Sequence, residues 1–442
     1  PADYNGYRRP PRSRVHCVSG RRPRRFVLTT AISAAAALLA ACGGSDAPRG
    51  SVLSNSVIAT VPKAAIDGAM AAASLSPLTR PAVCDVVIRE IVYPTPGPKG
   101  GLFDVSAALL VPTNCTGSVP SPMPLVAYNR GTEVKKSRAM ASATDEETGV
   151  LMGLLAAQGY AVVATDYLGY NKSNHSYHPY LHADSQASTT VDSIRAARGA
   201  MSALGLSTSG RLLLTGYSQG GHASLATLKA IQADTSLGLT VTAAGPMSGP
   251  YSLTNSFVTG LAFLPTGTGG SSIFTPLLVS AYQKVYGNLY SSVSDFYKAP
   301  YATGIEDLLP GPLSFTELYT NGKLPVNLGD LVTTGAITSL GDANSAIRKA
   351  LAANDLVTGW APAVPLMLCG GSGDPVVLYS ANTQAAMTAF GGASAARVEV
   401  DVNAAMNAAG SPSFSESYHG SALPFCLAAV RDGLFANVLA PN

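Results

Sequence analysis

Short apolar runs alternate with longer segments of helical periodicity along most of the chain. The apolar runs predict strands at 86–92, 102–111, 125–129, 161–166, 212–216, 241–245, 365–368 and 398–402. Apolar positions three and four residues apart predict helices at 149–158, 187–204, 222–232, 378–390 and 423–438. Strands that are apolar on both faces and alternate with helices are typical of a mostly parallel sheet covered by helices on both sides.

The first two predicted strands are joined by a connector rich in Pro and Gly, which predicts an antiparallel pair. An antiparallel start followed by a parallel sheet fits the α/β-hydrolase fold, which is the fold class that we predict. Residues 251–355 break the alternation and hold twelve Phe and Tyr residues. We expect this segment to be an inserted, mainly helical cap, in which most rings, such as Tyr282 and Phe296, pack in the cap's own core and a few face the substrate.

The predicted organisation therefore has five parts, in the order of the chain. They are a leader with a signal peptide (1–42), a tether and N-terminal segment (43–75), the first part of the core (76–250), the cap (251–355) and the second part of the core (356–442).

The composition is 47% hydrophobic and only 12% charged, which excludes a disordered chain and a long charged helix. The formal net charge of +3 comes from the leader, because residues 1–41 contain eight Arg. Without them the balance is negative and no basic run remains, so we expect no nucleic-acid partner.

The leader has the layout of a bacterial export signal, with a basic segment at 21–25 and an apolar run at 26–41. The residues Leu39-Ala40-Ala41-Cys42 resemble a lipobox, which predicts acylation of Cys42 and a membrane-anchored lipoprotein on the periplasmic or cell-surface side. The alternative is a secreted protein cleaved near Ala41. Arg24-Arg25 resembles a twin-arginine signal, with a generic basic segment as the alternative.

Four cysteines follow Cys42, an even number that predicts two disulfides in an oxidising compartment. Three pairings are possible. We favour Cys84–Cys115, which brackets two adjacent strands, and Cys369–Cys426, of which each member lies near a predicted catalytic loop.

The sequence Gly216-Tyr217-Ser218-Gln219-Gly220 is the chain's one G-x-S-x-G motif, and it lies between a predicted strand and a predicted helix. A nucleophilic serine on such a tight turn needs small flanking residues. Ser218 is therefore the predicted nucleophile, with a structural turn serine as the alternative.

A serine nucleophile needs a base, and in this fold the order along the chain is Ser, acid, His. Only His222 and His419 follow Ser218. We expect His222 to pack or cap within the helix after the nucleophile, and we predict that His419, in a loop before the C-terminal helix, is the base.

The acid should leave the end of a strand, and Asp374 follows the predicted strand that ends near Cys369. Asp355 and Asp401 remain the alternatives.

Two backbone N–H groups should form the oxyanion hole. We predict Gln219, the residue after the nucleophile, and Thr132, with Gly131 as the alternative to Thr132. Arg130 and Glu133 flank this point, and the sequence leaves open whether they line the pocket or are solvated.

The spacing of His175, His178 and His182, with Asp184 nearby, invites a metal-site interpretation. The loop has no helix to align the ligands, so we predict no metal and no other cofactor.

Several segments together resemble the secretory lipase family, a branch of the α/β-hydrolases that includes lipase A-type enzymes and many exported bacterial esterases. They are Ala164-Thr-Asp-Tyr-Leu-Gly-Tyr170, His178-Pro-Tyr-Leu181, Asp192-x-x-Arg195-Ala-Ala-Arg198, Gly216-Tyr-Ser-Gln-Gly-Gly221, Asn354 and Gly373-Asp374-Pro375-Val376. The resemblance covers roughly residues 85–440. It implies hydrolysis of carboxylic esters, often of lipids, under a helical cap, and it accounts for His178 without a metal.

The family commonly carries His-Gly-Thr where this chain has Arg130-Gly131-Thr132. The retained Gly and Thr allow an oxyanion loop, so the departure affects the expected substrate more than the expected reaction.

The predicted function is that of an exported serine esterase or lipase that acts through an acyl-enzyme on a small-molecule or lipid ester. Two alternatives remain. An exported serine peptidase uses the same triad and fold, but no Glu-Glu pair that would anchor a free amine is apparent in the cap. A non-catalytic surface binding lipoprotein would not need Ser, Asp and His in the required order.

Overall fold

The computed structural model describes residues 47–117, 119–261, 270–391, 396–415 and 417–440. The predicted export signal and the predicted acylation site Cys42 lie outside the described residues.

One large sheet runs through the described part of the chain, in the order β1-β2-β3-β5-β4-β6-β7-β8-β9. The antiparallel strands β1, β2 and β3 begin the sheet, β3 is antiparallel to β5, and the strands from β5 to β9 pair in parallel. The strands are β1 (Ser54–Val61), β2 (Asp85–Pro96), β3 (Leu102–Thr113), β4 (Met123–Asn129), β5 (Ala161–Thr165), β6 (Thr208–Tyr217), β7 (Ala243–Met247), β8 (Leu366–Gly370) and β9 (Arg397–Asp401).

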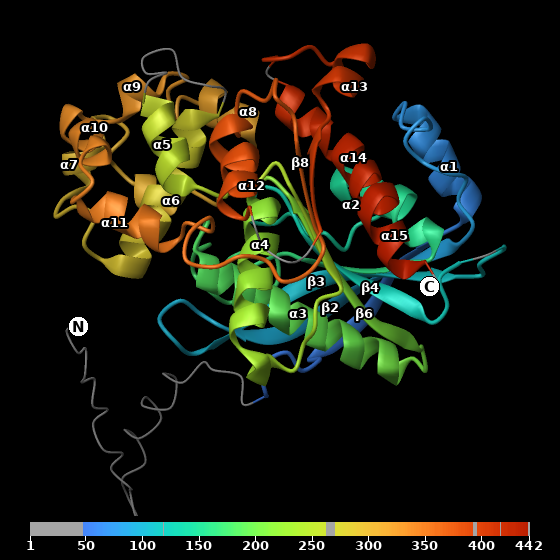
Figure 1. The fold of residues 1–442 in the computed structure, drawn as a ribbon. Coiled ribbons are helices and arrows are strands. Elements are labelled where there is room, and N and C mark those ends of the chain that lie inside the picture. Colours follow the sequence, from blue (N-terminus) through green and yellow to red (C-terminus); the bar gives the residue numbers. More distant parts are fainter. Residues whose placement is uncertain (1–46, 118, 262–269, 392–395, 416, 441–442) are drawn as a thin grey trace, which may run out of the picture. The chain divides into compact units, whose positions relative to one another are not determined.

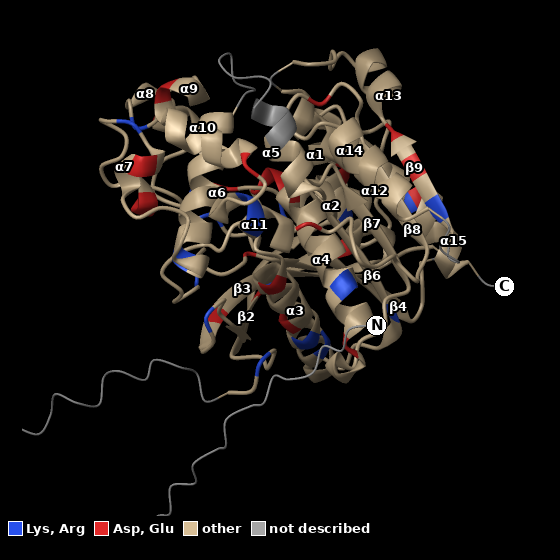
Figure 2. Cartoon of the chain, turned by 60° about the vertical axis from the view of Figure 1, so that its left-hand side comes forward, with Lys and Arg blue, Asp and Glu red and all other residues tan. Residues whose placement is uncertain are grey.

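Hydrophobic clusters cover both faces of this sheet. Successive residues of a strand point to opposite faces, so Val126 and Tyr128 of β4 join one cluster while Leu125 and Ala127 join the other. The first cluster includes residues of α1 (Lys63–Ala72), α2 (Glu146–Leu154) and α14 (Tyr418–Val430), and the second includes residues of α3 (Ala183–Ala203) and α4 (Gln219–Ala233). Burial on both faces explains why β4, β7 and β8 carry no charged residue (Figure 2).

A group of helices lies between β7 and β8 and gathers on one side of the molecule (Figure 1). It has its own hydrophobic cluster, in which Tyr282 and Phe296 are buried. The helices are α5 (Leu253–Leu261), α6 (Ser271–Tyr286), α7 (Val293–Phe296), α8 (Phe315–Thr320), α9 (Leu328–Leu331), α10 (Thr334–Gly341) and α11 (Ala346–Ala353). This insertion and the doubly covered, mostly parallel sheet confirm the predicted fold class, while the exact domain boundaries stay a prediction.

After β8 the chain forms α12 (Ala385–Ala389), β9, α13 (Asn403–Ala408), α14 and α15 (Ala436–Leu439). By length and composition alone, the helical stretch Tyr418–Leu439 could cross a membrane. Half of its most apolar stretch is buried inside the protein, and Cys426 and Leu427 are fully buried in the hydrophobic cluster that covers the sheet. We therefore interpret it as a core helix.

The N-terminal segment adds two elements that the sequence analysis did not predict. Residues 43–75 were expected to hold a tether, yet β1 pairs with β2 at the sheet edge and α1 packs on the sheet through Ile66 and Met70. β1 lacks an alternating pattern, because Val57 and Ile58 are both exposed.

Two disulfides join Cys84 to Cys115 and Cys369 to Cys426, which is the pairing that the sequence analysis favoured. The first closes the β2–β3 hairpin, and the second links β8 to α14.

Candidate active site

Ser218 lies on the sharp turn between β6 and α4, with a backbone φ of 59°. Left-handed φ values are costly for residues other than Gly and occur mainly where the surroundings enforce them. A Cβ at Gly216 would lie 2.4 Å from the carbonyl oxygen of Gly220, and a Cβ at Gly221 would lie 2.5 Å from that of Met247. The turn can therefore form only with glycine at these positions.

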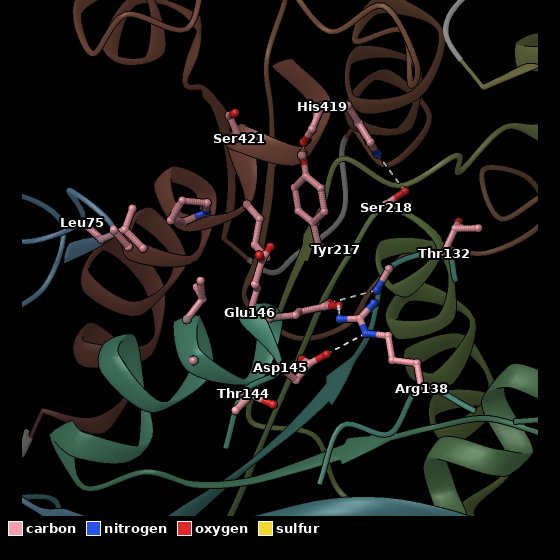
Figure 3. Close-up of a pocket in the computed structure, with 18 of the residues that line it drawn as sticks. Leu75, Thr132, Arg138, Thr144, Asp145, Glu146, Tyr217, Ser218, His419 and Ser421 are labelled. Atoms are coloured by element: carbon pink, nitrogen blue, oxygen red, sulfur yellow. Dashed lines mark hydrogen bonds and ion pairs between the residues drawn. The ribbon is translucent and has the colours of Figure 1, made fainter. Parts of the chain in front are cut away.

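Three side chains from distant parts of the chain meet at this turn. The Oγ of Ser218 lies 2.8 Å from Nε2 of His419, a contact drawn in Figure 3, and Nδ1 of His419 lies 2.6 Å from Oδ2 of Asp374. Asp374 is buried, while the side chain of His419 is 13% exposed. His419 is in the first turn of α14, not in a loop as the sequence analysis predicted.

The surroundings of Asp374 fix the direction of both hydrogen bonds. Its Oδ1 accepts from the backbone N–H groups of Val376 and Val377, which leaves Oδ2 to accept from His419. With Nδ1 as the donor, Nε2 of the neutral ring is the acceptor for the Ser218 hydroxyl. The structure thus brings together the three side chains that the sequence predicted.

The alternative candidates lie elsewhere. Asp355 accepts from the backbone N–H of Thr254, and Asp401 accepts from those of Ser372 and Asn403. His222 packs within α4, where its ring nitrogens contact Gln186 and Asn354, and burial lowers its pKa to about 4.

The loop after β4 runs directly beside the nucleophile, since a Cβ at Gly131 would lie 4.0 Å from that of Ser218. The N–H of Gly131 already donates to Oε1 of Glu147, at 2.9 Å. By contrast, the N–H groups of Thr132 and Gln219 donate to no other residue in the described part of the chain. Of the candidate oxyanion donors, these two are thus the ones that have no acceptor among the described residues.

The side chain of Gln219 is anchored by a neutral histidine. Nδ1 of His178 donates to the carbonyl oxygen of Leu168, so its Nε2 accepts from Nε2 of Gln219, at 2.6 Å. Burial lowers the pKa of His178 to about 3, which keeps the ring uncharged. His178 therefore helps to fix the residue that follows the nucleophile.

Arg130 and Glu133, whose surroundings the sequence left open, neither line the cleft nor face solvent. Arg130 is fully buried, with its guanidinium 4.2 Å from the ring centre of Tyr170. Glu133 accepts from the N–H groups of Val134 and Lys135 and pairs with Arg138.

A cleft of about 660 Å³ opens beside Ser218 and His419. Figure 3 shows Leu75 on the side of the cleft opposite to Ser218 and Thr132. The apolar lining of the cleft comes from five helices, α1, α2, α6, α8 and α14, and from the segment that follows α1. The apolar residues are Ala69, Met70, Ala73, Leu75, Val150, Phe274, Phe315, Leu423 and Pro424. Charged lining comes from Arg138, Asp145, Glu146 and Glu147.

The wall that α1 and α2 form along the cleft was not predicted from the sequence. No motif marks these residues, and they reach the cleft only because both helices pack on the same face of the sheet as α14. Phe274 and Phe315 agree with the expectation that a few aromatic rings of the insertion face the substrate.

The histidine-rich loop makes hydrogen bonds within the protein. Nδ1 of His175 contacts the carbonyl oxygen of Tyr177, and Nδ1 of His182 contacts the hydroxyl of Ser185. Across the described ranges, no group of three or more His, Cys, Asp or Glu side chains is arranged so that it could hold a metal ion.

Known proteins share the family signature and the fold of this chain. The model of the secretory lipase family matches residues 134–250. The structure is similar to a ligand-bound form of the rice cell wall degrading esterase LipA from Xanthomonas oryzae, with 31% identity, a TM-score of 0.79, and coverage of 88% of this chain and 100% of that one.

Two further solved structures share the fold. A putative hydrolase from Legionella pneumophila has 22% identity and a TM-score of 0.77, with coverage of 88% of this chain and 100% of that one. Candida antarctica lipase A has 16% identity and a TM-score of 0.57, with coverage of 81% and 79%. No curated protein sequence matches the chain.

Proposed function

Because the chain belongs to the secretory lipase family of the α/β-hydrolases, we propose that it hydrolyses carboxylic esters with Ser218 as nucleophile, His419 as base and Asp374 as the acid that orients His419. The observation that carries this proposal is the continuous pair of hydrogen bonds from Ser218 through His419 to Asp374.

In the first half of the reaction, Oγ of Ser218 attacks the ester carbonyl carbon while Nε2 of His419 takes the hydroxyl proton. The negative charge that develops on the carbonyl oxygen is stabilised by the N–H groups of Gln219 and Thr132. Asp374 stabilises the charged imidazolium. The intermediate then collapses, the bond to the alcohol oxygen breaks, and His419 gives its proton to the leaving alcohol.

In the second half, water attacks the acyl-enzyme. His419 takes a proton from the water, the same two N–H groups stabilise the second oxyanion, and the bond between the carbonyl carbon and Oγ breaks. The proton returns to Ser218 as the carboxylic acid leaves. The enzyme is then ready for another ester.

The cleft supports an ester that carries an apolar group. Its walls contain the apolar side chains of Met70, Leu75, Val150, Leu423, Phe274 and Phe315. Contact with an acyl or alkyl chain removes such a surface from water, which favours binding. We therefore favour esters with at least a short aliphatic chain over small polar esters.

We also propose that the protein is exported and anchored through an acylated Cys42. The support is the lipobox-like sequence that ends in Cys42 and the two disulfides, which persist in oxidising compartments. Expression of the full chain in bacteria with labelled palmitate should label the wild type and not Cys42→Ser. An unlabelled membrane fraction, or labelling of both proteins, would contradict the anchor.

The activity test compares residues 43–442 with the Ser218→Ala variant, by release of p-nitrophenol from butyrate and palmitate esters. We expect turnover by the wild type and a loss of at least about 10³-fold in the variant, as triad removal causes. Failure of a fluorophosphonate to label the folded wild type would contradict a serine mechanism. Labelling without cleavage of either ester would instead favour a peptidase.

A further inference from the structure

The two neighbours of Thr132 in the loop after β4 are both held by charged side chains. Oε1 of Glu147 accepts from the N–H of Gly131, at 2.9 Å. On the other side, Nη1 of Arg138 donates to Oε2 of Glu133, at 3.1 Å, while its Nη2 donates to Oε2 of Glu147, also at 3.1 Å. One network of ion pairs and hydrogen bonds therefore contacts the loop on both sides of Thr132.

We propose that Glu147 is a positioning residue that holds the N–H of Thr132 toward the oxyanion. This inference rests on the proposed serine mechanism. Glu147 hydrogen-bonds to Gly131, not to Thr132, and so acts through the direction of the loop. Donors that are fixed before the reaction begins stabilise developing charge without a cost of reorganisation, which is why a tie of this kind affects the rate.

The position of Glu147 is itself well defined. It lies in the first turn of α2, and the N-cap residue Asp145 accepts from the N–H of Thr148 and also from Nε of Arg138, at 2.6 Å. Three carboxylates surround Arg138, and these contacts raise the pKa of its guanidinium, so the cation stays charged. Figure 3 shows Arg138 directed toward Asp145 beneath Ser218 and Tyr217.

A carboxylate is required at this position because three donors converge on it. Oε1 of Glu147 also accepts from the hydroxyl of Tyr128, at 2.6 Å, and the side chain is only 10% exposed. A carboxamide has one acceptor oxygen and two N–H donors, so glutamine would turn an N–H toward at least one of the three donors. A glutamine whose oxygen stays on Gly131 and Tyr128 turns its NH2 group toward the Arg138 guanidinium, so Glu147→Gln either loses the acceptor of Gly131 or breaks the contact with Arg138 that ties Glu147 to the loop, with little change in volume.

The side chain of Thr132 provides an additional hold, because its hydroxyl lies 2.8 Å from that of Tyr180. This contact fixes the side chain, while the network around Glu147 fixes the main chain on either side. Loss of Glu147 should thus turn the peptide group without removing Thr132 from the cleft.

The test compares Glu147→Gln with Glu146→Gln. Glu146 lines the same cleft and carries the same charge, but no hydrogen bond or ion pair joins it to the loop within the described part of the chain. Three quantities are measured: kcat and KM for p-nitrophenyl butyrate, the inhibition constant of an alkyl trifluoromethyl ketone, and that of the matching secondary alcohol. The ketone forms an oxyanion when Ser218 adds to it, and the alcohol does not.

We expect Glu147→Gln to lower kcat by about 10- to 100-fold relative to Glu146→Gln. This loss should not exceed the roughly 10²- to 10³-fold loss in kcat that follows removal of one oxyanion donor. The inhibition constant of the ketone should rise by a similar factor, while KM and the inhibition constant of the alcohol stay of the same order. A merely structural role would lower the melting temperature and leave kcat and ketone binding equal in the two variants, which would overturn the proposal.

If Glu147→Gln does not fold, Glu133→Gln provides the second variant. It weakens the hold of Arg138 on the other side of Thr132, and Glu133 does not line the cleft. The same split between the ketone and the alcohol is expected, and its absence would count against the proposal. Ser218→Ala separates the two hypotheses: if this variant still turns over ester, the proposed function fails, whereas its inactivity beside an unimpaired Glu147→Gln rejects only the positioning role.

Discussion

A Cβ atom at Gly220 would lie 1.8 Å from the carbonyl oxygen of Asn129. The first turn of α4 and the end of β4 therefore touch backbone to backbone. This contact brings the residue after the nucleophile and the loop that carries Thr132 to the same point, so the packing of two elements aligns both candidate oxyanion donors.

Gly220→Ala should therefore be strongly destabilising. The three atoms nearest to this Cβ are all backbone atoms, so no flexible side chain can move away, and we expect a loss of at least about 3 kcal/mol in the free energy of unfolding. Urea unfolding measures this loss. The matched control is Gly68→Ala in the exposed part of α1, where a Cβ meets nothing within 4 Å and should add about 0.5–1 kcal/mol. Equal stability of the two variants would contradict this account.

Asp374→Asn should remove most of the activity without unfolding the protein. Oδ1 of an asparagine can still accept from Val376 and Val377, but its amide N–H₂ would then face Nδ1 of His419 and favour the wrong tautomer. We expect kcat to fall by about 10⁴-fold with a small change in KM. Steady-state kinetics checks this.

The comparison for Asp374 is Asp355→Asn, which removes the carboxylate that accepts from Thr254 and does not contact His419. This variant should keep activity of the same order as the wild type. If Asp355→Asn were the inactive one, the acid would have to be reassigned.

The parts of the site that the sequence predicted are those set by local rules. The glycine spacing around Ser218 is demanded by a tight turn, and the order of nucleophile, acid and base follows from the order of strands in this fold. The C-terminal helix, predicted to begin at residue 423, begins at Tyr418, so the loop predicted around His419 is the first turn of α14.

The parts that the sequence did not predict depend on contacts between elements. Glu147 reaches Gly131 only after α2 has packed on the sheet, and no spacing rule links the two residues. Arg130 looked like a solvated or pocket-lining charge, yet it is fully buried with its guanidinium against the ring of Tyr170. The edge strand β1 was missed because its exposed Val57 breaks the alternation that marks a half-buried strand.

The two disulfides should contribute similarly to stability but differently to activity. They close loops of 31 and 57 residues, and chain entropy gives about 4 kcal/mol for each. Cys369 lies at the end of β8, shortly before Asp374, and Cys426 lies in the helix that begins beside His419. Loss of this bond should therefore loosen the pair formed by the acid and the base.

The measurement compares two double variants, Cys369→Ser with Cys426→Ser and Cys84→Ser with Cys115→Ser. Both should lower the melting temperature. Only the variant without the Cys369–Cys426 bond should also lower kcat well below the melting transition, because the Cys84–Cys115 bond joins the ends of the β2–β3 hairpin, whose strands carry none of the three candidate catalytic side chains. An equal kcat in both variants would contradict a link between the Cys369–Cys426 disulfide and the active site.

Acid should weaken the fold through His178. Its pKa is about 3 in the folded protein, against an ordinary value of 6.5, because burial disfavours the charged ring. Between these two values the unfolded chain binds a proton that the folded protein does not, so the free energy of unfolding decreases as the pH falls, by about 1.4 kcal/mol per pH unit. The contribution is fully present above pH 6.5 and is lost progressively below it.

Urea unfolding of the wild type and of His178→Asn at pH 7.5, 6 and 5 tests this, since the variant lacks this proton uptake. The wild type should be the more stable protein at pH 7.5, and its advantage should shrink by roughly 2 kcal/mol by pH 5. A constant difference across this range would mean that His178 is not kept neutral by the fold.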